Sequence, residues 1–177
     1  MKLKVKKQLA LFDYDGTIVD SAIMIVKGAL EAFRICGLPA PDPIKVKENI
    51  GKPLAIALDE YMPKGYYVTP NEISEAYRNW YAEQGKLGLQ DEPLFPGMYD
   101  LLKKLKKTGF WYLGIATNKS RIALDNGLAK HNLTNLFDIT LTTDEINPKP
   151  SPDMALIAMK KLNISNKSTL IIGDTTN

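Results

Sequence analysis

The sequence predicts an α/β fold in which a Rossmann-like parallel sheet core carries an inserted α-helical module. Three observations lead to this prediction. Short apolar runs alternate with amphipathic helical patterns, polar residues follow each run, and almost a hundred residues separate the first run from the second. The alternation is typical of a parallel sheet covered by helices. A single crossover helix would not fill the long gap, so a helical insertion is the economical explanation.

Four apolar runs have the length of a strand, at 9–12, 111–116, 137–141 and 170–172. Helices fit between the later runs. One is predicted by apolar residues at helical spacing: Met98, Leu101, Leu102 and Leu105. Another is predicted to start at Ser151-Pro152-Asp153, with a capping hydroxyl, a proline at the first position and an acid in the first turn. This part of the chain therefore predicts the order βαβαβαβ.

The long gap contains two further helical patterns. One has its apolar face at Ile23, Val26, Leu30 and Phe33, and the other at Ile73, Tyr77, Trp80 and Tyr81. The second follows a capping box that runs from Thr69 to Glu72. The turn-rich stretch 90–97 returns the chain to the sheet. We therefore expect a core domain from 1–17 and 91–177, and a helical domain at 18–90.

Composition excludes several classes of protein. The 177 residues are 45% hydrophobic and 24% charged, as in an ordinary globular protein. The net charge is +3, but four of the basic residues lie in the first seven positions, so the remainder is near neutral and does not favour nucleic-acid binding. No apolar run is long enough for a membrane helix or an export signal. The single cysteine, Cys36, forms no disulfide within the chain and favours a reducing, cytoplasmic location.

Two acids follow the first predicted strand, in the segment Asp13-Tyr14-Asp15-Gly16. In open α/β sheets, ligands bind at the carboxyl ends of the strands. Because strand side chains alternate, Asp13 and Asp15 start out on the same side. Such a pair is suited to holding Mg²⁺, with one carboxylate attacking phosphorus and the other moving protons. The alternative is an acidic turn that merely closes the strand.

The other strand ends also carry polar groups. Thr117 and Asn118 follow the second run and are able to donate hydrogen bonds to a phosphoryl oxygen, or simply to cap a helix. Lys149 lies between prolines after the third run, where its ammonium either neutralises a phosphoryl group or is solvated. Asp174 leaves the fourth run through a glycine turn and is placed for metal binding. The collection predicts one shared site better than coincidence does.

With these motifs the chain resembles the haloacid dehalogenase superfamily, in the subgroup of phosphatases similar to phosphoglycolate phosphatase. Residues 13–21 match the first family motif, and Thr117, Lys149 and Asp174 match the next three in order. The resemblance implies that Asp13 is a nucleophile that forms an aspartyl-phosphate and that Asp15 is the general acid and then the general base. It also implies that Thr117 and Lys149 hold the phosphoryl group, with Asn118 beside them. Mg²⁺ would be bound by Asp13, the carbonyl of Asp15 and Asp174.

The resemblance also assigns a role to the insertion at 18–90, as a cap that closes over a small substrate. Residues 51–54 resemble a cap segment that faces the active site, so Lys52 is expected to contact the substrate, the alternative being a solvated lysine. An acid at position 15 favours phosphate esters, because superfamily members that cleave carbon–halogen bonds typically lack it.

The chain departs from the family pattern at its C-terminal end. The second acid of the fourth motif is absent, and Asn177 lies about where that acid should follow. We therefore expect a C-terminally truncated member, with weaker metal binding. The predicted strand at 170–172 would then lie at a sheet edge, and the chain would be a monomer or a weak homodimer.

Together these expectations describe a Mg²⁺-dependent phosphatase that hydrolyses a small phosphorylated metabolite, such as 2-phosphoglycolate. One alternative is a sugar phosphomutase of the same architecture. Another is an inactive relative that acts as a phosphate-binding or interaction protein.

Overall fold

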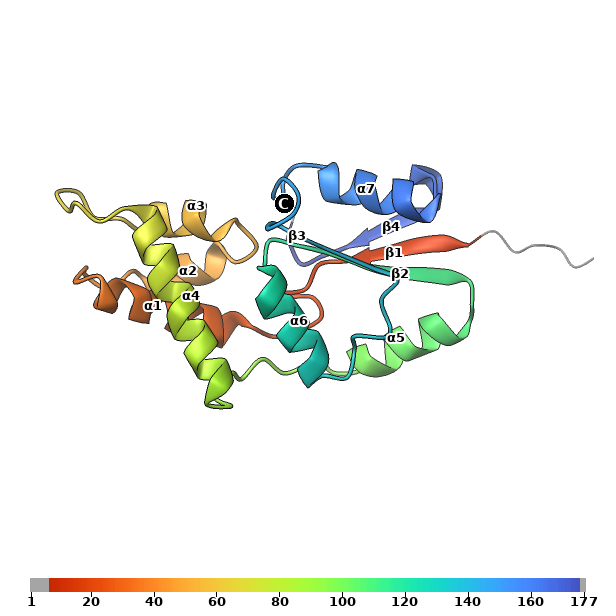
Figure 1. Cartoon of the computed structure of the whole chain (residues 1–177), viewed down its shortest axis with the longest axis horizontal. Helices are drawn as coiled ribbons and strands as arrows, with labels where there is room; N and C mark the ends of the chain where they lie inside the picture. The colour runs from red at the N-terminus through yellow and green to blue at the C-terminus, as the bar shows by residue number, and fades with distance from the viewer. Residues whose placement is uncertain (1–6, 176–177) are drawn as a thin grey trace, which may run out of the picture. The chain divides into compact units, whose positions relative to one another are not determined.

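The computed structural model describes residues 7–175. They divide into two compact units, one made of the residues up to Val19 together with those from Leu94 onwards, and the other made of Asp20–Pro93. Within the described residues, the first unit contains the β-strands and the second is helical (Figure 1).

The sheet of the first unit has four parallel strands in the order β3-β2-β1-β4. The strands are β1 (Gln8–Phe12), β2 (Trp111–Thr117), β3 (Ile139–Thr142) and β4 (Thr169–Ile172). The predicted α/β fold with a parallel sheet is therefore confirmed. The third strand begins two residues later than predicted. Asp138 already donates its main-chain N–H to the Leu113 carbonyl at 2.8 Å, and its carboxylate accepts from the Leu113 N–H at 2.9 Å. The regular ladder between β2 and β3 starts at Ile139.

Helices cover both faces of this sheet. Figure 1 shows α7 (Asp153–Leu162) on one face, and α5 (Met98–Lys107) and α6 (Arg121–Lys130) on the other. Side chains along β1 point alternately to the two faces of the sheet, so this strand contributes to the hydrophobic cluster on each face. Leu9 and Leu11 pack towards α7, while Ala10 and Phe12 pack towards α5 and α6. Because both faces of β1 are buried, its residues 9–12 are all apolar rather than alternating with polar residues.

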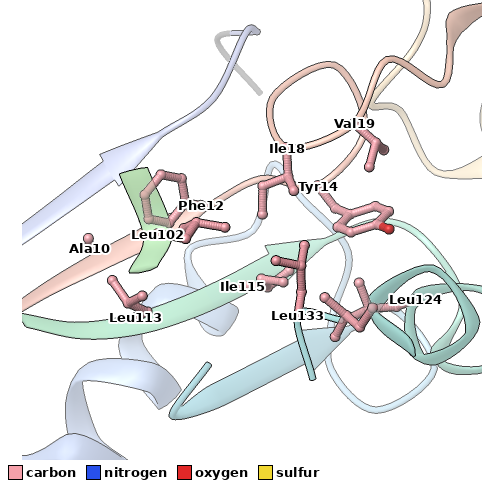
Figure 2. Close-up of a cluster of buried hydrophobic side chains, with 11 residues drawn as sticks. Ala10, Phe12, Tyr14, Ile18, Val19, Leu102, Leu113, Ile115, Leu124 and Leu133 are labelled. Carbon is pink, nitrogen blue, oxygen red and sulfur yellow. The ribbon is translucent and has the colours of Figure 1, made fainter. Parts of the chain in front are cut away.

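Tyr14 extends the core on the α5 and α6 side beyond the end of β1. Its side chain has no exposed surface and joins the cluster drawn in Figure 2, beside Leu124 of α6. The phenol approaches α6 at Gly127, where it fills the space that a Cβ atom would take. A glycine at this helical position therefore allows Tyr14 to pack under α6.

The helical unit consists of α1 (Ala22–Ile35), α2 (Pro43–Glu48), α3 (Leu54–Asp59) and α4 (Pro70–Lys86). The predicted capping box of α4 is present: the Thr69 hydroxyl accepts from the Glu72 N–H, and the Glu72 carboxylate accepts from the Thr69 N–H. The apolar face of α1 lies differently from the prediction. Ile23 is 58% exposed, and Ala29 and Ala32 line the packed face beside Phe33. These alanines let α1 pack closely against its neighbours, and a pattern of large apolar residues does not indicate them.

Arg121, the first residue of α6, fastens this helix to the segment after β3. Its guanidinium donates to both carboxylate oxygens of Glu145, at 2.9 and 3.0 Å, and to the carbonyl of Thr140. The Arg121 N–H also donates to the Asp144 carboxylate. Hydrogen bonding to Arg121 holds the pKa of Glu145 below its ordinary value.

Among residues 7–175, no helix combines the length and apolar character that a membrane crossing requires.

Replacing Gly127 by alanine should destabilise the protein by about 1–3 kcal/mol, because the new methyl group would displace the buried Tyr14 side chain. An alanine normally stabilises a helix interior by about 1 kcal/mol relative to glycine, so the expected sign is reversed. Gly85→Ala in α4 is the matched control, since its nearest neighbour is the flexible Gln90 side chain. Urea unfolding of both variants tests this, and a stabilised Gly127→Ala protein would contradict it.

Glu145→Gln should lower the free energy of unfolding by about 0.5–1 kcal/mol at pH 7, a modest figure because the carboxylate is partly exposed. The wild-type ion pair stabilises the fold above the ordinary glutamate pKa and loses its effect as pH falls through the lowered pKa of the folded state. The difference between the proteins should therefore shrink steadily below about pH 4.5. Denaturant midpoints across this pH range measure it, with Glu83→Gln as a control at an exposed ion pair. If the loss of stability in the Glu145→Gln protein stayed constant with pH, the ion pair between Arg121 and Glu145 would not be its cause.

Candidate active site

The carboxyl ends of the four parallel strands carry the predicted site residues to one edge of the sheet. Asp13 follows β1 directly, Thr117 ends β2, and Asp174 follows β4 after one intervening residue, Gly173. Lys149 reaches the same place from the segment between β3 and α7, since its ammonium lies 2.6 Å from the Asp13 carboxylate. All of these residues belong to the first unit.

Asp13 is buried, with 7% of its surface exposed. Its N–H donates to the carbonyl of Ile172 in the neighbouring strand, which fixes the main chain. One carboxylate oxygen accepts from the N–H of Tyr14 at 2.7 Å, and the other pairs with Lys149. Burial raises the pKa of Asp13, and the charge and hydrogen bond of Lys149 act in the opposite direction. The result is a held carboxylate whose orientation is set by two donors, as a nucleophile requires.

Asp15 is paired with Lys119, a residue that no motif in the sequence indicated. The Lys119 ammonium lies 2.9 Å from Oδ1 of Asp15, and both side chains are largely shielded from solvent. The only signal in the sequence was the position of Lys119, two residues beyond Thr117 at the same strand end. That position is equally typical of a solvated lysine before a helix, and only the fold shows that the ammonium turns towards the first strand.

Thr117 and Asn118 have different surroundings. Thr117 is buried, and its hydroxyl oxygen accepts from the N–H of Lys119 at 3.2 Å, so the hydroxyl proton is directed elsewhere. The Asn118 carboxamide bonds the main chain of Lys149 at both ends: Oδ1 accepts from its N–H at 2.8 Å and Nδ2 donates to its carbonyl at 3.2 Å. Asn118 therefore holds the segment that presents Lys149, while its contact with phosphate stays a prediction.

Asp174 lies against the segment that follows Asp13. Its carboxylate fills the space over Gly16 that a Cβ atom would occupy, and it accepts from the Thr17 hydroxyl at 3.5 Å. Gly16 has a φ of +77°, a conformation that favours glycine. Both properties make glycine the fitting residue here, because a larger one would strain the turn and push Asp174 away.

The magnesium ligands expected from the sequence are oxygen atoms at this edge of the sheet. Among residues 7–175, no three histidine, cysteine, aspartate or glutamate side chains form a group that would hold a metal. The expected ligand set differs from such a group, since it combines the carboxylates of Asp13 and Asp174 with the main-chain carbonyl of Asp15. Oxygen ligands of this kind are the ones that Mg²⁺ prefers, and remaining positions are usually taken by water and substrate.

Lys52 belongs to the helical unit. Its ammonium pairs with both carboxylate oxygens of Glu60, at 2.7 and 2.9 Å, and the Asn49 side chain donates to the same carboxylate at 3.1 Å. The ammonium is therefore engaged and partly exposed. The predicted substrate contact of Lys52 stays a prediction.

Comparison with known proteins agrees with this fold. The model of the haloacid dehalogenase-like hydrolase family matches residues 10–177. A protein of Dickeya dadantii named probable phosphatase IndB is 33% identical, over 96% of this chain and 74% of its own length. A phosphoglycolate phosphatase of Vibrio vulnificus is 27% identical, over 96% of this chain and 76% of its own.

A solved structure gives the same result. A haloacid dehalogenase-like hydrolase from Bacteroides fragilis superposes with a TM-score of 0.80 and 27% identity, over 97% of this chain and 80% of that one. The family match spans both the strand ends that carry Asp13, Thr117, Lys149 and Asp174 and the helical insertion between them. This chain belongs to the haloacid dehalogenase-like hydrolase family.

Proposed function

We propose that this chain hydrolyses small phosphomonoesters through a covalent aspartyl-phosphate on Asp13. Family membership and the phosphatase relatives support a phosphoric monoester hydrolase. The observation that carries the proposal for the residues is the buried Asp13 carboxylate paired with Lys149 at 2.6 Å. Such a pair provides a nucleophile and, beside it, a cation for the oxygens of the group under attack.

In the first step an oxygen of Asp13 forms a bond to phosphorus, and the ester bond between phosphorus and the leaving oxygen breaks. Asp15 gives a proton to that oxygen, so the alcohol leaves neutral. In the second step Asp15 takes a proton from water, the water oxygen bonds to phosphorus, and the bond to Asp13 breaks. The sum is ester plus water giving alcohol plus phosphate, with both aspartates restored.

The remaining site residues hold charge in place during both steps. Lys149 neutralises oxygens of the transferring group, and the Thr117 hydroxyl donates a hydrogen bond to one of them. Asn118 contributes by fixing the main chain of Lys149, and in our proposal also lies beside the phosphoryl group. Asp13, the Asp15 carbonyl and Asp174 would hold Mg²⁺. When bound, the ion offsets the negative charge of the carboxylates and of the phosphoryl oxygens.

The substrate we propose is a small phosphorylated metabolite such as 2-phosphoglycolate, which the name of the Vibrio vulnificus relative supports. In this proposal the helical unit acts as a cap, with Lys52 contacting the substrate. The single cysteine favours a cytoplasmic location. We propose a monomer or a weak homodimer, and weak pairing is favoured because, in the described sheet, β4 lies at an edge and exposes Leu170 and Ile171.

Asp13→Asn should reduce hydrolysis of 2-phosphoglycolate by at least about a thousandfold, because the amide is a far weaker nucleophile. Phosphate release measures it, with circular dichroism to show that the variant is folded. Asp125→Asn, on the exposed face of α6, is the control and should keep full activity. Persistent hydrolysis by the Asp13 variant would rule out this nucleophile. Transfer of phosphate to a hexose phosphate in place of water would favour the phosphomutase, and phosphate binding without turnover would favour a binding protein.

Hydrolysis should stop when the protein is treated with a chelator and return on addition of Mg²⁺. Asp174→Asn should raise the Mg²⁺ concentration needed for half-maximal activity by about tenfold or more, because one of two carboxylate ligands becomes neutral. Titration of Mg²⁺ against initial rate at saturating substrate measures both effects. Turnover that is indifferent to the chelator, or a metal requirement unchanged in the Asp174 variant, would remove Asp174 from the ligand set.

A further inference from the structure

Lys119 is the residue of this site that neither the sequence pattern nor the proposed reaction has assigned. It follows β2, whereas its ammonium lies 2.9 Å from Oδ1 of Asp15, which is 104 positions earlier in the chain. Only 9% of the Lys119 side chain is exposed. Burying a lysine costs free energy that even a buried ion pair often does not return in full, so its place in the site calls for a functional explanation.

Two contacts besides the ion pair fix the position of Lys119. Its N–H donates to the Thr117 hydroxyl, which ties its main chain to the end of β2. Its ammonium lies 5.6 Å from the centre of the Tyr14 ring, within the range of a cation–π interaction. Tyr14 is itself locked in the core, so the ring is a rigid support. The ammonium is thereby presented to Asp15 from a fixed position.

The two acids that the reaction uses each have an ammonium of their own. Lys149 pairs with Asp13, and Lys119 pairs with Asp15. The pairing separates their tasks: Lys149 lies at the carboxylate that receives the phosphoryl group, while Lys119 lies at the carboxylate that moves protons. A free aspartate side chain rotates about two bonds, and a misplacement of about 1 Å costs up to about a hundredfold in rate.

We propose that Lys119 is a positioning residue, which holds Oδ1 of Asp15 and so leaves Oδ2 as the oxygen that exchanges protons with the leaving group and water. This inference rests on the proposed function. An ammonium has only donors, so it is able to donate to Oδ1 whether or not Oδ2 carries a proton. Lys119 thus keeps Asp15 in one orientation through both steps of the reaction.

The competing explanation is that Lys119 binds the phosphoryl group directly. The positioning role and the phosphate-binding role predict different effects of a Lys119 substitution on different substrates. An alkyl ester such as 2-phosphoglycolate needs a proton on its leaving oxygen, whereas p-nitrophenyl phosphate releases a stable phenolate that needs none. A positioning residue for the proton donor therefore matters for the alkyl ester alone, and a phosphate ligand matters equally for both.

The test compares kcat/KM for these two esters in wild type, Lys119→Met and Lys119→Ala. This quantity covers the steps up to formation of the aspartyl-phosphate, so it excludes the later use of Asp15 with water. We expect the alkyl ester to lose about 10- to 100-fold and the aryl ester less than about threefold. The inhibition constant of inorganic phosphate should change by less than about threefold. Lys106→Met is the matched control, since it removes a half-buried ion pair with Asp138 and should leave the ratio of the two esters unchanged.

An equal loss for both esters, together with weaker inhibition by phosphate, would overturn the proposal in favour of a phosphate ligand. A ratio equal to that of wild type in a folded variant would overturn it as well. The alanine variant, which places no apolar chain beside Asp15, supplies the measurement if the methionine variant does not fold. Absence of hydrolysis by the wild-type protein would instead reject the proposed function, so the two failures are distinguishable.

Discussion

The parallel pairing of β1 with both β2 and β4 is the constraint on which the candidate site depends. Leu11 lies opposite Gly114 in β2 and Ile171 in β4, and from this register the three strands reach their carboxyl ends together. The hydrogen bond from the Asp13 N–H to Ile172 continues the pairing by one residue. Asp13 is therefore held by the sheet itself rather than by a free loop, and a rigid element positions reactive groups better than a loop does.

Charge is the second organising factor at this edge. Asp13, Asp15 and Asp174 bring three negative charges, and Lys119 and Lys149 bring two positive ones. Burial alone disfavours the charged form of Asp13, so each ammonium compensates a cost that the location imposes. When all five side chains are ionised the formal balance is one negative charge, and a divalent cation bound together with a phosphate dianion would leave that balance unchanged. This arrangement explains why removing any one partner is expected to disturb its neighbours.

Much of the fold and most of the candidate site could be predicted from the sequence, because both depend on local pattern. The apolar runs gave the strands, and Asp13, Thr117, Lys149 and Asp174 each follow such a run. The capping box at Thr69 is likewise local. The sequence did not predict contacts between residues that lie far apart in the chain. The contact of Lys119 with Asp15, the bonds of Asn118 to Lys149 and the packed alanines of α1 arise only when segments far apart in the chain meet.

Tyr14 has a consequence that reaches beyond packing. It stands between the two acids in the chain, and its ring is anchored in the same apolar cluster as Leu124 and Leu133 (Figure 2). Tyr14 thus belongs both to the hydrophobic core and to the segment that carries Asp13 and Asp15. The positions of both aspartates therefore depend in part on how Tyr14 packs in the core. Substitutions on the buried side of α6 that displace Tyr14 would therefore also displace the two aspartates and alter turnover, although these positions contact no phosphate.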